Sequence, residues 1–287
     1  MPSVVLALVA IAIWSSLALL STATFGLPPL FTTGIALAIG GLVGLFRIRD
    51  WRVSLATFAV GLGGIFGYHA LLFAAFSLAP AVEVNILNYL WPLLIVVLSP
   101  LVLPGLRLSP RHVAGAFLGL AGAVLVATGG EIGPHSGSLL GLALAATAAI
   151  VWALYSLLTK RLPPFPTGAV GGFCLASGLL SLALLALTGG ATFHFPAPRP
   201  GQWMALLALG LGPMGAAFYA WDASLKRGDP RVIGSLAYLT PLLSTFNLVV
   251  FGGKSFTPLT AAALVLIVGG AVLGSSGSFK KKEPVTA

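Results

Sequence analysis

The stretch Glu83–Pro92, EVNILNYLWP, places two asparagines, a tyrosine and a tryptophan inside a run of about 25 otherwise apolar residues. On a helix that turns 100° per residue, four of its residues fall within about 100° of arc. They form one polar and aromatic stripe: Asn85, Asn88, Tyr89 and Pro92. Lipid offers these polar groups no partners, so the stripe is expected to face other protein or a water-filled cavity. The proline removes a backbone donor and predicts a kink.

Composition places this stripe in a membrane protein. The 287 residues are 58% hydrophobic and 7% charged, with a mean hydropathy of +1.04, which excludes a soluble globular domain. The net charge of +9 would indicate nucleic acid in a soluble protein, but here Lys and Arg occupy short connections between apolar runs. We therefore expect the bilayer as partner and no nucleic acid. The single cysteine, Cys174, cannot form an internal disulfide.

Ten apolar runs approach the roughly 20 residues that span a bilayer. They cover residues 3–22, 28–46, 54–78, 82–103, 111–129, 137–159, 167–187, 202–225, 231–252 and 258–276, and are numbered here as spans 1 to 10. The first run has no basic segment before it, so we interpret it as a span and not as a signal peptide. The sequence thus predicts five spans in residues 1–130, five in residues 137–277, and a basic tail over residues 278–287.

The basic residues predict an orientation. With ten spans, all of the 15 Lys and Arg except Arg199 and Lys254 would lie on one side of the membrane, together with both termini. Cytoplasmic connections are rich in Lys and Arg, so this side is predicted to be the cytoplasm. A bacterial-type inner (plasma) membrane is the predicted location.

The two halves of the chain resemble each other. AVGLGG from Ala59 matches ALGLGP from Ala208, NYLWP from Asn88 matches AYLTP from Ala237, and GAVL occurs at both Gly122 and Gly270. Five spans are therefore duplicated. Because five is odd, the second copy enters the membrane from the opposite face, which is the inverted-repeat plan of transporters with a binding site at the midplane.

These repeats, the prolines of spans 4 and 9, and the glycine-rich GAVL segments resemble the drug/metabolite transporter superfamily in its EamA-like branch. The resemblance covers nearly the whole chain. It implies an all-α fold of ten transmembrane helices around a central cavity walled by spans 1, 3, 4, 6, 8 and 9. It also implies alternating access and export of small amphipathic metabolites, with aromatic amino acids favoured by the aromatic residues inside the spans.

Depth along the spans indicates the same central site. At 1.5 Å per residue, several aromatic residues lie roughly 10–22 Å into a core about 30 Å thick, whereas aromatic residues of the membrane interface occupy span ends. Trp51 and Trp203 do lie near span ends. The predicted cavity residues are Trp14, Tyr68, His69, Asn85, Asn88, Tyr89, Trp91, Trp152, Tyr155, Ser156, Phe218 and Tyr238, and Pro92 and Pro241 are the predicted hinges. Helix packing is the alternative role for each aromatic residue alone.

Titratable residues are few. His69 is either a packing residue or a substrate and proton site, Glu83 suits the N-terminal dipole of its helix, and Asp222 has the i,i+4 spacing of an ion pair with Lys226. No carboxylate falls near the midplane, and span 1 lacks the carboxylate that small multidrug-resistance relatives carry. The sequence therefore predicts transport down the gradient of the substrate, without proton coupling.

Other motifs carry no chemistry. GLGPMG at Gly210 matches a dinucleotide pattern but lies within a span without a preceding strand. Glycine pairs such as Gly40 with Gly44, Gly63 with Gly67, Gly115 with Gly119 and Gly270 with Gly274 predict close helix packing. The scattered histidines indicate no metal, and we expect no cofactor and no enzymatic activity. A broad drug or metabolite carrier and a membrane-embedded structural subunit remain the alternatives to an amino acid exporter.

Overall fold

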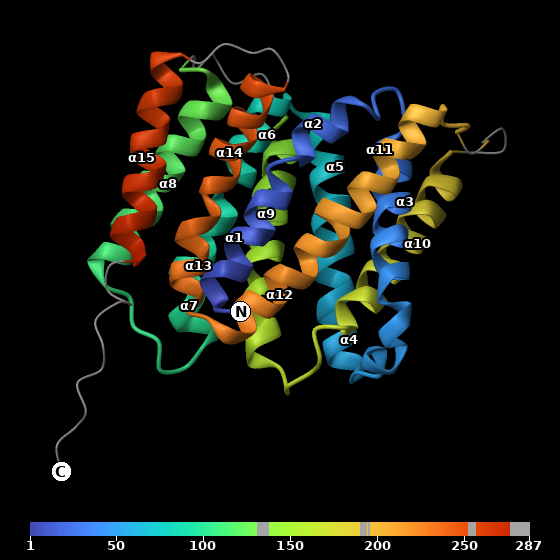
Figure 1. Ribbon diagram of the computed structural model, residues 1–287, viewed down its shortest axis with the longest axis horizontal. Coiled ribbons are helices and arrows are strands. Elements are labelled where there is room, and N and C mark those ends of the chain that lie inside the picture. Colours follow the sequence, from blue (N-terminus) through green and yellow to red (C-terminus); the bar gives the residue numbers. More distant parts are fainter. Residues whose placement is uncertain (131–137, 190–193, 195, 252–256, 276–287) are drawn as a thin grey trace.

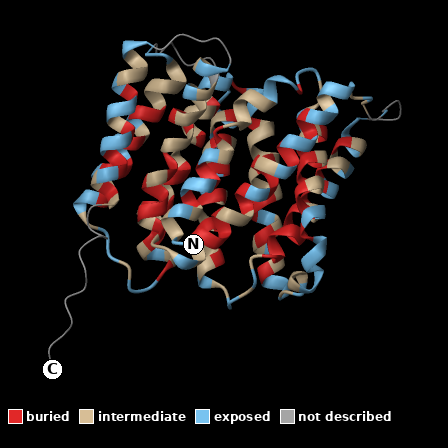
Figure 2. Cartoon of the chain, in the orientation of Figure 1, coloured by how far each residue is buried: buried red, intermediate tan, exposed pale blue. Residues whose placement is uncertain are grey.

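The computed structural model describes residues 1–130, 138–189, 194, 196–251 and 257–275, and within them every regular element is a helix. Figure 1 shows these helices side by side in one bundle, with α8 beside α15 at one edge and α3 beside α10 at the other. Glu131, Lys254 and the tail at 278–287 lie outside the described residues. Buried residues gather in the middle of the bundle (Figure 2).

The first half contains five spans. They are α1 (Ser3–Trp14) with α2 (Leu17–Thr22), α3 (Pro29–Leu42) with η1 (Val43–Trp51), α4 (Leu55–Leu62) with η2 (Gly63–Gly67) and α5 (Tyr68–Leu78), α6 (Ala81–Asn88) with α7 (Leu90–Val102), and α8 (Pro110–Thr128). Prolines at the first position begin α3 and α8, where the missing N–H costs no hydrogen bond.

The second half repeats this order. It comprises α9 (Leu139–Arg161), α10 (Ala169–Thr188), α11 (Pro200–Leu211) with η3 (Gly212–Ala216) and α12 (Ala217–Arg227), α13 (Pro230–Ala237) with α14 (Leu239–Val250), and α15 (Pro258–Ser275). In the described part of the chain, nine helical stretches are long and apolar enough to cross a membrane, and α13 with α14 forms the tenth crossing, interrupted at its middle.

Irregular backbone recurs at matching places in the two halves. A π-helical turn occupies η2 in span 3 and η3 in span 8, and spans 4 and 9 are interrupted at Tyr89 and Tyr238. Each pair has the spacing of the sequence repeats, so the duplication extends to the backbone. The interruptions fall three residues before Pro92 and Pro241. This position fits the chemistry of proline, because its ring clashes with the carbonyl four residues earlier in a helix.

Small residues allow the close helix packing that the sequence predicts, with one exception. A Cβ built on Gly115 would lie 2.5 Å from the carbonyl oxygen of Gly270, and one on Gly40 would lie 2.5 Å from that of Met214. The prediction for the pair Gly63 and Gly67 does not hold at Gly63, where a Cβ meets nothing within 4 Å, and at Gly67 a Cβ would make only an ordinary contact with Val151 at 3.8 Å. These two glycines instead bound the π-helical turn.

The contact between α8 and α15 gives a stability prediction. Gly115→Ala should destabilise the protein by about 1–3 kcal/mol, because the new methyl group meets backbone atoms that cannot rotate away. Gly269→Ala is the matched control, since its Cβ meets nothing within 4 Å. Thermal unfolding in detergent should give a lower midpoint for Gly115→Ala and an unchanged or higher one for Gly269→Ala. Equal midpoints for the two variants would contradict tight packing of α8 on α15.

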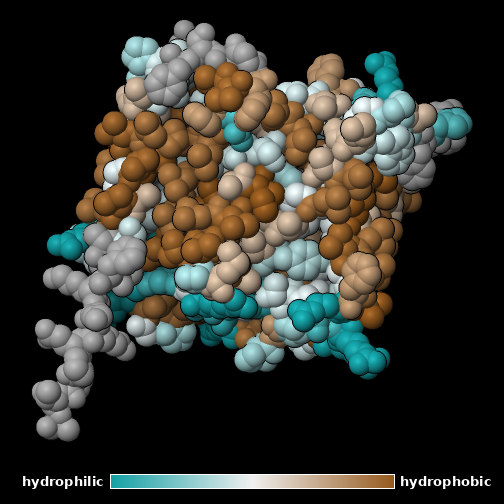
Figure 3. Space-filling view, viewed as in Figure 1, coloured by the Kyte–Doolittle hydropathy of each residue, from teal (hydrophilic) through white to brown (hydrophobic). Residues whose placement is uncertain are grey.

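Hydrophilic residues gather at the ends of the bundle. Figure 3 shows hydrophobic residues across the middle of the visible face and most of the hydrophilic ones at the end where the N-terminus lies. This end is called the basic end here, because the cations Lys160, Arg161 and Arg231 lie there beside the first residues of α1 and the end of α12. A bilayer-sized apolar band with polar ends is the surface of a membrane protein.

Candidate substrate site

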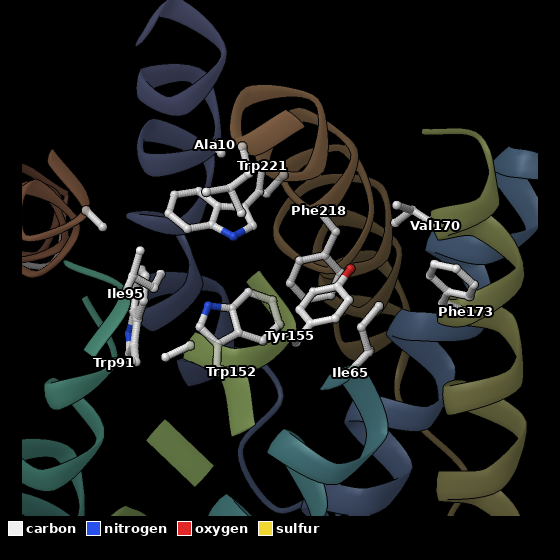
Figure 4. Packing of buried hydrophobic residues seen from close by; sticks show 14 of the residues in the cluster. Ala10, Ile65, Trp91, Ile95, Trp152, Tyr155, Val170, Phe173, Phe218 and Trp221 are labelled. Atoms are coloured by element: carbon white, nitrogen blue, oxygen red, sulfur yellow. The ribbon is translucent and has the colours of Figure 1, made fainter. Parts of the chain in front are cut away.

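Five aromatic rings from four helices meet at the centre of the bundle, and they are called the ring cluster here. They are Trp14 of α1, Trp91 of α7, Trp152 of α9, and Phe218 and Trp221 of α12. The centroid of the Trp14 ring lies 5.2–6.3 Å from those of the other four. Figure 4 shows Trp91, Trp152, Phe218 and Trp221 close to one another. Edge-to-face pairs at these distances are the favourable geometry for aromatic contacts.

The ring cluster continues into a polar group on span 3. Tyr68 lies 5.1 Å from Trp152 between ring centroids, and its hydroxyl accepts a hydrogen bond from Asn88 Nδ2 at 3.2 Å. His69 stacks beside Tyr68 at 5.0 Å, and its Nδ1 lies 2.7 Å from the carbonyl oxygen of Ile65. One ring nitrogen of His69 is thus occupied by its own helix. Four of the predicted residues of spans 3, 4 and 6 therefore lie together: Tyr68, Asn88, Trp91 and Trp152.

The indole N–H groups of the ring cluster differ in their partners. Trp14 Nε1 donates to the carbonyl of Pro213 at 3.0 Å, and Trp221 Nε1 donates to Ser156 Oγ at 3.1 Å. Among the residues that the structure describes, none accepts a hydrogen bond from the indole N–H of Trp91 or Trp152, and the buried indole N–H of Trp51, outside the ring cluster, also lacks a partner. Trp91 and Trp152 are 8% and 3% exposed, so these two donors lie within the ring cluster. A carboxylate is the kind of acceptor that such donors would bind.

Not every predicted cavity residue joins the ring cluster. Tyr238 has no exposed surface and lies in a second apolar cluster with Leu93, Ala116 and Ile267, against which Tyr89 also packs. Asn85 is half-buried, and its side chain makes no hydrogen bond to a described residue. The members of the stripe on span 4 thus have different neighbours. Asn88 contacts Tyr68 beside the ring cluster, whereas Tyr89 packs against the cluster that contains Tyr238 of span 9.

The remaining predicted residues pack against the ring cluster or lie beside the interruptions of spans 4 and 9. Tyr155 stacks on Trp152 at 5.3 Å, and a Cβ on Gly64 would lie 2.3 Å from its ring, so the glycine is what makes room for it. Ser156 is fully buried and holds Trp221. Pro92 and Pro241 are both buried beside the interruptions of their spans. Tyr155 and Ser156 thus hold rings of the cluster in place, and the two prolines shape the backbone of their spans.

Sequence reasoning missed Trp221. It follows Phe218 by three residues, a spacing that puts both rings on one helix face, and this was the available signal. At this end of span 8, the sequence spacing drew attention only to the ion pair of Asp222 with Lys226. The predicted ion pair is confirmed, with Asp222 Oδ2 2.7 Å from Lys226 Nζ, but the carboxylate is buried next to the ring cluster, with a side-chain exposure of 1%.

Cations at the basic end bind backbone carbonyls of other spans. Lys160 Nζ donates to the carbonyls of Leu225 at 3.0 Å and Gly228 at 2.6 Å, and Arg161 Nη1 donates to that of Val102 at 3.1 Å. These carbonyls belong to the last turns of α12 and α7 and to the residue after α12, where helical partners run out. The interactions fasten α9 to α12 and α7.

Span 9 is anchored at the same end. The carboxylate of Asp229 caps α13 by accepting the Arg231 N–H at 2.9 Å, and the guanidinium of Arg231 binds both this carboxylate and the carbonyl of Arg107. Burial alone would raise the pKa of Asp229, but the hydrogen bonds and the charge of Arg231 outweigh it and lower this pKa below its usual value. Asp229 therefore stays ionised near neutral pH and keeps the start of span 9 in place.

The described residues contain no group of three or more His, Cys, Asp or Glu side chains that could hold a metal ion. GLGPMG forms the end of α11 and the π-helical turn η3, with no strand before it, so it lacks the context of a dinucleotide site.

The sequence matches the EamA-like transporter family twice, over residues 1–128 and 137–276, so the chain belongs to this family of membrane transporters. It is 42% identical over 275 residues to the aromatic amino acid exporter YddG of Ancylobacter novellus, covering 93% of this chain and 94% of the relative. It is 26% identical to the YddG of Escherichia coli K12, covering 83% of this chain and 84% of the relative.

Two further comparisons bear on substrate and fold. The threonine/homoserine exporter RhtA of Escherichia coli K12 is 26% identical, over 88% of this chain and 83% of that relative. A solved crystal structure superposes with a TM-score of 0.87 at 40% identity, covering 96% of this chain and 97% of that one. The predicted ten-span duplicated transporter fold is confirmed, as is the prediction of a transporter in place of an enzyme.

Proposed function

We propose that this chain exports aromatic amino acids and that the ring cluster is their binding site. The observation that carries the proposal is that no described residue accepts a hydrogen bond from the indole N–H of Trp91 or Trp152, whose rings lie 6.4 Å apart within the ring cluster. An aromatic amino acid offers both a ring to stack on the walls and a carboxylate for the N–H groups. The names of the relatives at 42% and 26% identity agree with this substrate.

Smaller amino acids are the second candidate, because RhtA is named as an exporter of threonine and homoserine. The ring cluster argues against them as the preferred substrates. Threonine has a carboxylate but presents no ring, so it would leave the aromatic walls in contact with water. A lipophilic cation could contact the rings, but it has no carboxylate and would leave both indole donors without an acceptor.

Counterflow in proteoliposomes tests the substrate. Vesicles loaded with unlabelled phenylalanine should accumulate external labelled phenylalanine transiently, and external tryptophan should inhibit this uptake more than threonine or a lipophilic cation does. Empty vesicles and vesicles with heat-inactivated protein are the controls. Strongest inhibition by threonine would favour an exporter of small amino acids, equal inhibition by all compounds a broad carrier, and no uptake above the controls a structural subunit.

The same vesicles test the energy source. With equal pH inside and outside, phenylalanine should equilibrate down its own gradient, because no carboxylate of the described residues lies within the ring cluster itself. An imposed pH gradient that drives uphill accumulation would contradict a facilitator. Loss of that accumulation in His69→Gln or Asp222→Asn, with exchange intact, would then identify the coupling residue.

We place the protein in the plasma membrane of a bacterial cell, with residues 1–130 and 137–277 as inverted repeats, a basic tail at 278–287, and the basic end in the cytoplasm. The charge distribution supports this orientation. A Phe25→Cys variant should react with an impermeant maleimide added outside intact cells, because Phe25 is 89% exposed at the opposite end. An Arg49→Cys variant should react only after the cells are permeabilised. The reversed pattern would refute the orientation, and Cys174, which is buried, serves as background.

A further inference from the structure

The interruptions of spans 4 and 9 are joined by one hydroxyl group. Tyr238, the residue at which span 9 is interrupted, reaches across to span 4 with its side chain. Its hydroxyl accepts the N–H of Leu93 at 3.1 Å and donates to the carbonyl of Tyr89 at 3.1 Å. Leu93 and Tyr89 are four residues apart, so in a regular α-helix these two groups would bond to each other. The Tyr238 hydroxyl thus bridges the backbone groups at the bend in span 4.

Only a hydroxyl can serve in this position. It has a donor and an acceptor on one atom, and the bridged groups include one of each kind. Pro92, which directly precedes Leu93, offers no N–H, so the turn has already lost one helical bond. A side chain inserted at such a place kinks a helix. Tyr238 therefore acts as a positioning residue: it sets the angle between α6 and α7 through their backbone, in the turn that also carries Trp91.

The reciprocal bridge is chemically complete but not formed. Tyr89 occupies in span 4 the place of Tyr238 in span 9, and Leu242 occupies the place of Leu93. By the repeat, the Tyr89 hydroxyl would bridge the N–H of Leu242 and the carbonyl of Tyr238. In this structure the Tyr89 hydroxyl bonds to no residue that the structure describes. The two repeats have equivalent tyrosines, but only Tyr238 forms its bridge among the described residues.

The two halves of spans 4 and 9 also differ in how they pack. The halves of spans 4 and 9 that lie toward the basic end, α7 and α13, pack together: a Cβ on Gly234 would lie 3.1 Å from Ile95, Val96 and the carbonyl of Pro92. The other halves have different neighbours, α6 against α9 and α14 against α8 and α1. Engagement of Tyr238 therefore coincides with closure at the basic end.

We propose that the two tyrosines alternate: Tyr238 bridges span 4 when the basic end is closed, and Tyr89 bridges span 9 when the opposite end is closed. The reason is the inverted symmetry of the repeats. When each repeat adopts the shape of the other, the transporter opens at one end and closes at the other around an unchanged midplane. Because one hydroxyl bridge replaces the other, the state closed at the basic end and the state closed at the opposite end would have similar free energies. This alternation does not depend on which amino acid is carried.

The experiment measures which end is open. In a Cys174→Ala background, a cysteine at Val96 reports on the basic end, because Val96 is fully buried where α7 meets α13. Purified protein in nanodiscs is treated, without substrate, with a small polar thiol reagent that reaches both ends. The modification rate of the cysteine at position 96 is compared among Tyr238→Phe, Tyr89→Phe, the double variant and the parent. Phenylalanine keeps each ring, so packing is preserved.

Opposite effects of the two variants are expected. Tyr238→Phe should raise the modification rate about fivefold, and Tyr89→Phe should lower it by a similar factor, as the net loss of one or two hydrogen bonds implies. The double variant should return near the parental rate. Tyr219→Phe is the matched control, because it removes a different tyrosine bond to backbone, to Gly40 at 3.2 Å, and should change nothing.

A purely structural role for these hydroxyls gives a different pattern. If both single variants raised the rate, or if neither changed it while their unfolding midpoints stayed normal, the alternation would be refuted. Lower unfolding midpoints with unchanged reactivity would also refute it, since the hydroxyls would then only stabilise the fold. Substrate counterflow is not part of this measurement, so failure of the alternation and failure of the proposed substrate are distinguishable.

Discussion

Phenylalanine transport is expected to fall by roughly tenfold to a hundredfold in kcat/KM when Trp152 is replaced by leucine. Trp152 has five aromatic neighbours, Trp14, Tyr68, Trp91, Tyr155 and Phe218, at centroid distances of 5.1–6.4 Å. It also carries one of the two indole donors without a protein acceptor. The substitution removes both a wall against the substrate ring and a donor for its carboxylate.

The matched control is Trp203→Leu. Trp203 is 46% exposed on α11 and lies outside the ring cluster, so its replacement should leave transport nearly unchanged. Trp152→Phe retains a ring and should recover part of the activity, which separates stacking from the indole donor. Binding of phenylalanine to Trp152→Leu as tightly as to the parent would show that the substrate site lies elsewhere. Unfolding midpoints of the three variants identify any loss that is due to misfolding.

Much of this architecture could be predicted from local sequence. The ten spans could be predicted because the length of an apolar run and the charge of a connection depend on neighbouring residues and on solvation. The duplication could be predicted from the spacing between NYLWP and AYLTP. Which residues an individual side chain contacts in the folded bundle could not be predicted in this way. Tyr89 was assigned to the cavity by its place in the stripe of span 4 and Tyr238 by its depth in span 9, and neither argument specifies which side chains they contact.

The difference between those tyrosines and the ring cluster lies in rotation about the helix axis. Interruption of span 4 at Tyr89 turns the following residues relative to the preceding ones, so a stripe drawn on a continuous helix is divided in space. The π-helical turns do the same in spans 3 and 8, because each inserts a residue. The inward position of Trp221 depends likewise on its contacts with Trp14, Trp91 and Ser156, which local sequence does not specify.

Asp222→Ala is expected to destabilise the protein by about 3–5 kcal/mol, more than any other single loss of charge in the bundle. The buried carboxylate of Asp222 accepts from the Thr167 hydroxyl at 2.6 Å and binds Lys226. The ammonium of Lys226 also donates to the carbonyl of Phe165 at 3.0 Å and lies 3.4 Å above its ring. The pair thus ties α12 to the segment before α10, directly beside the ring cluster.

A double substitution separates the pair from its burial. Lys226→Met should destabilise as well, because it leaves the Asp222 carboxylate in the interior without a counter-ion, whereas Asp222→Leu with Lys226→Met removes both charges and should cost less than either single change. Arg227→Met is the control, since Arg227 is exposed and its loss should change stability by less than about 0.5 kcal/mol. Titration with SDS in mixed micelles measures these differences. A double variant as unstable as the sum of the single ones would mean that the two charges act independently.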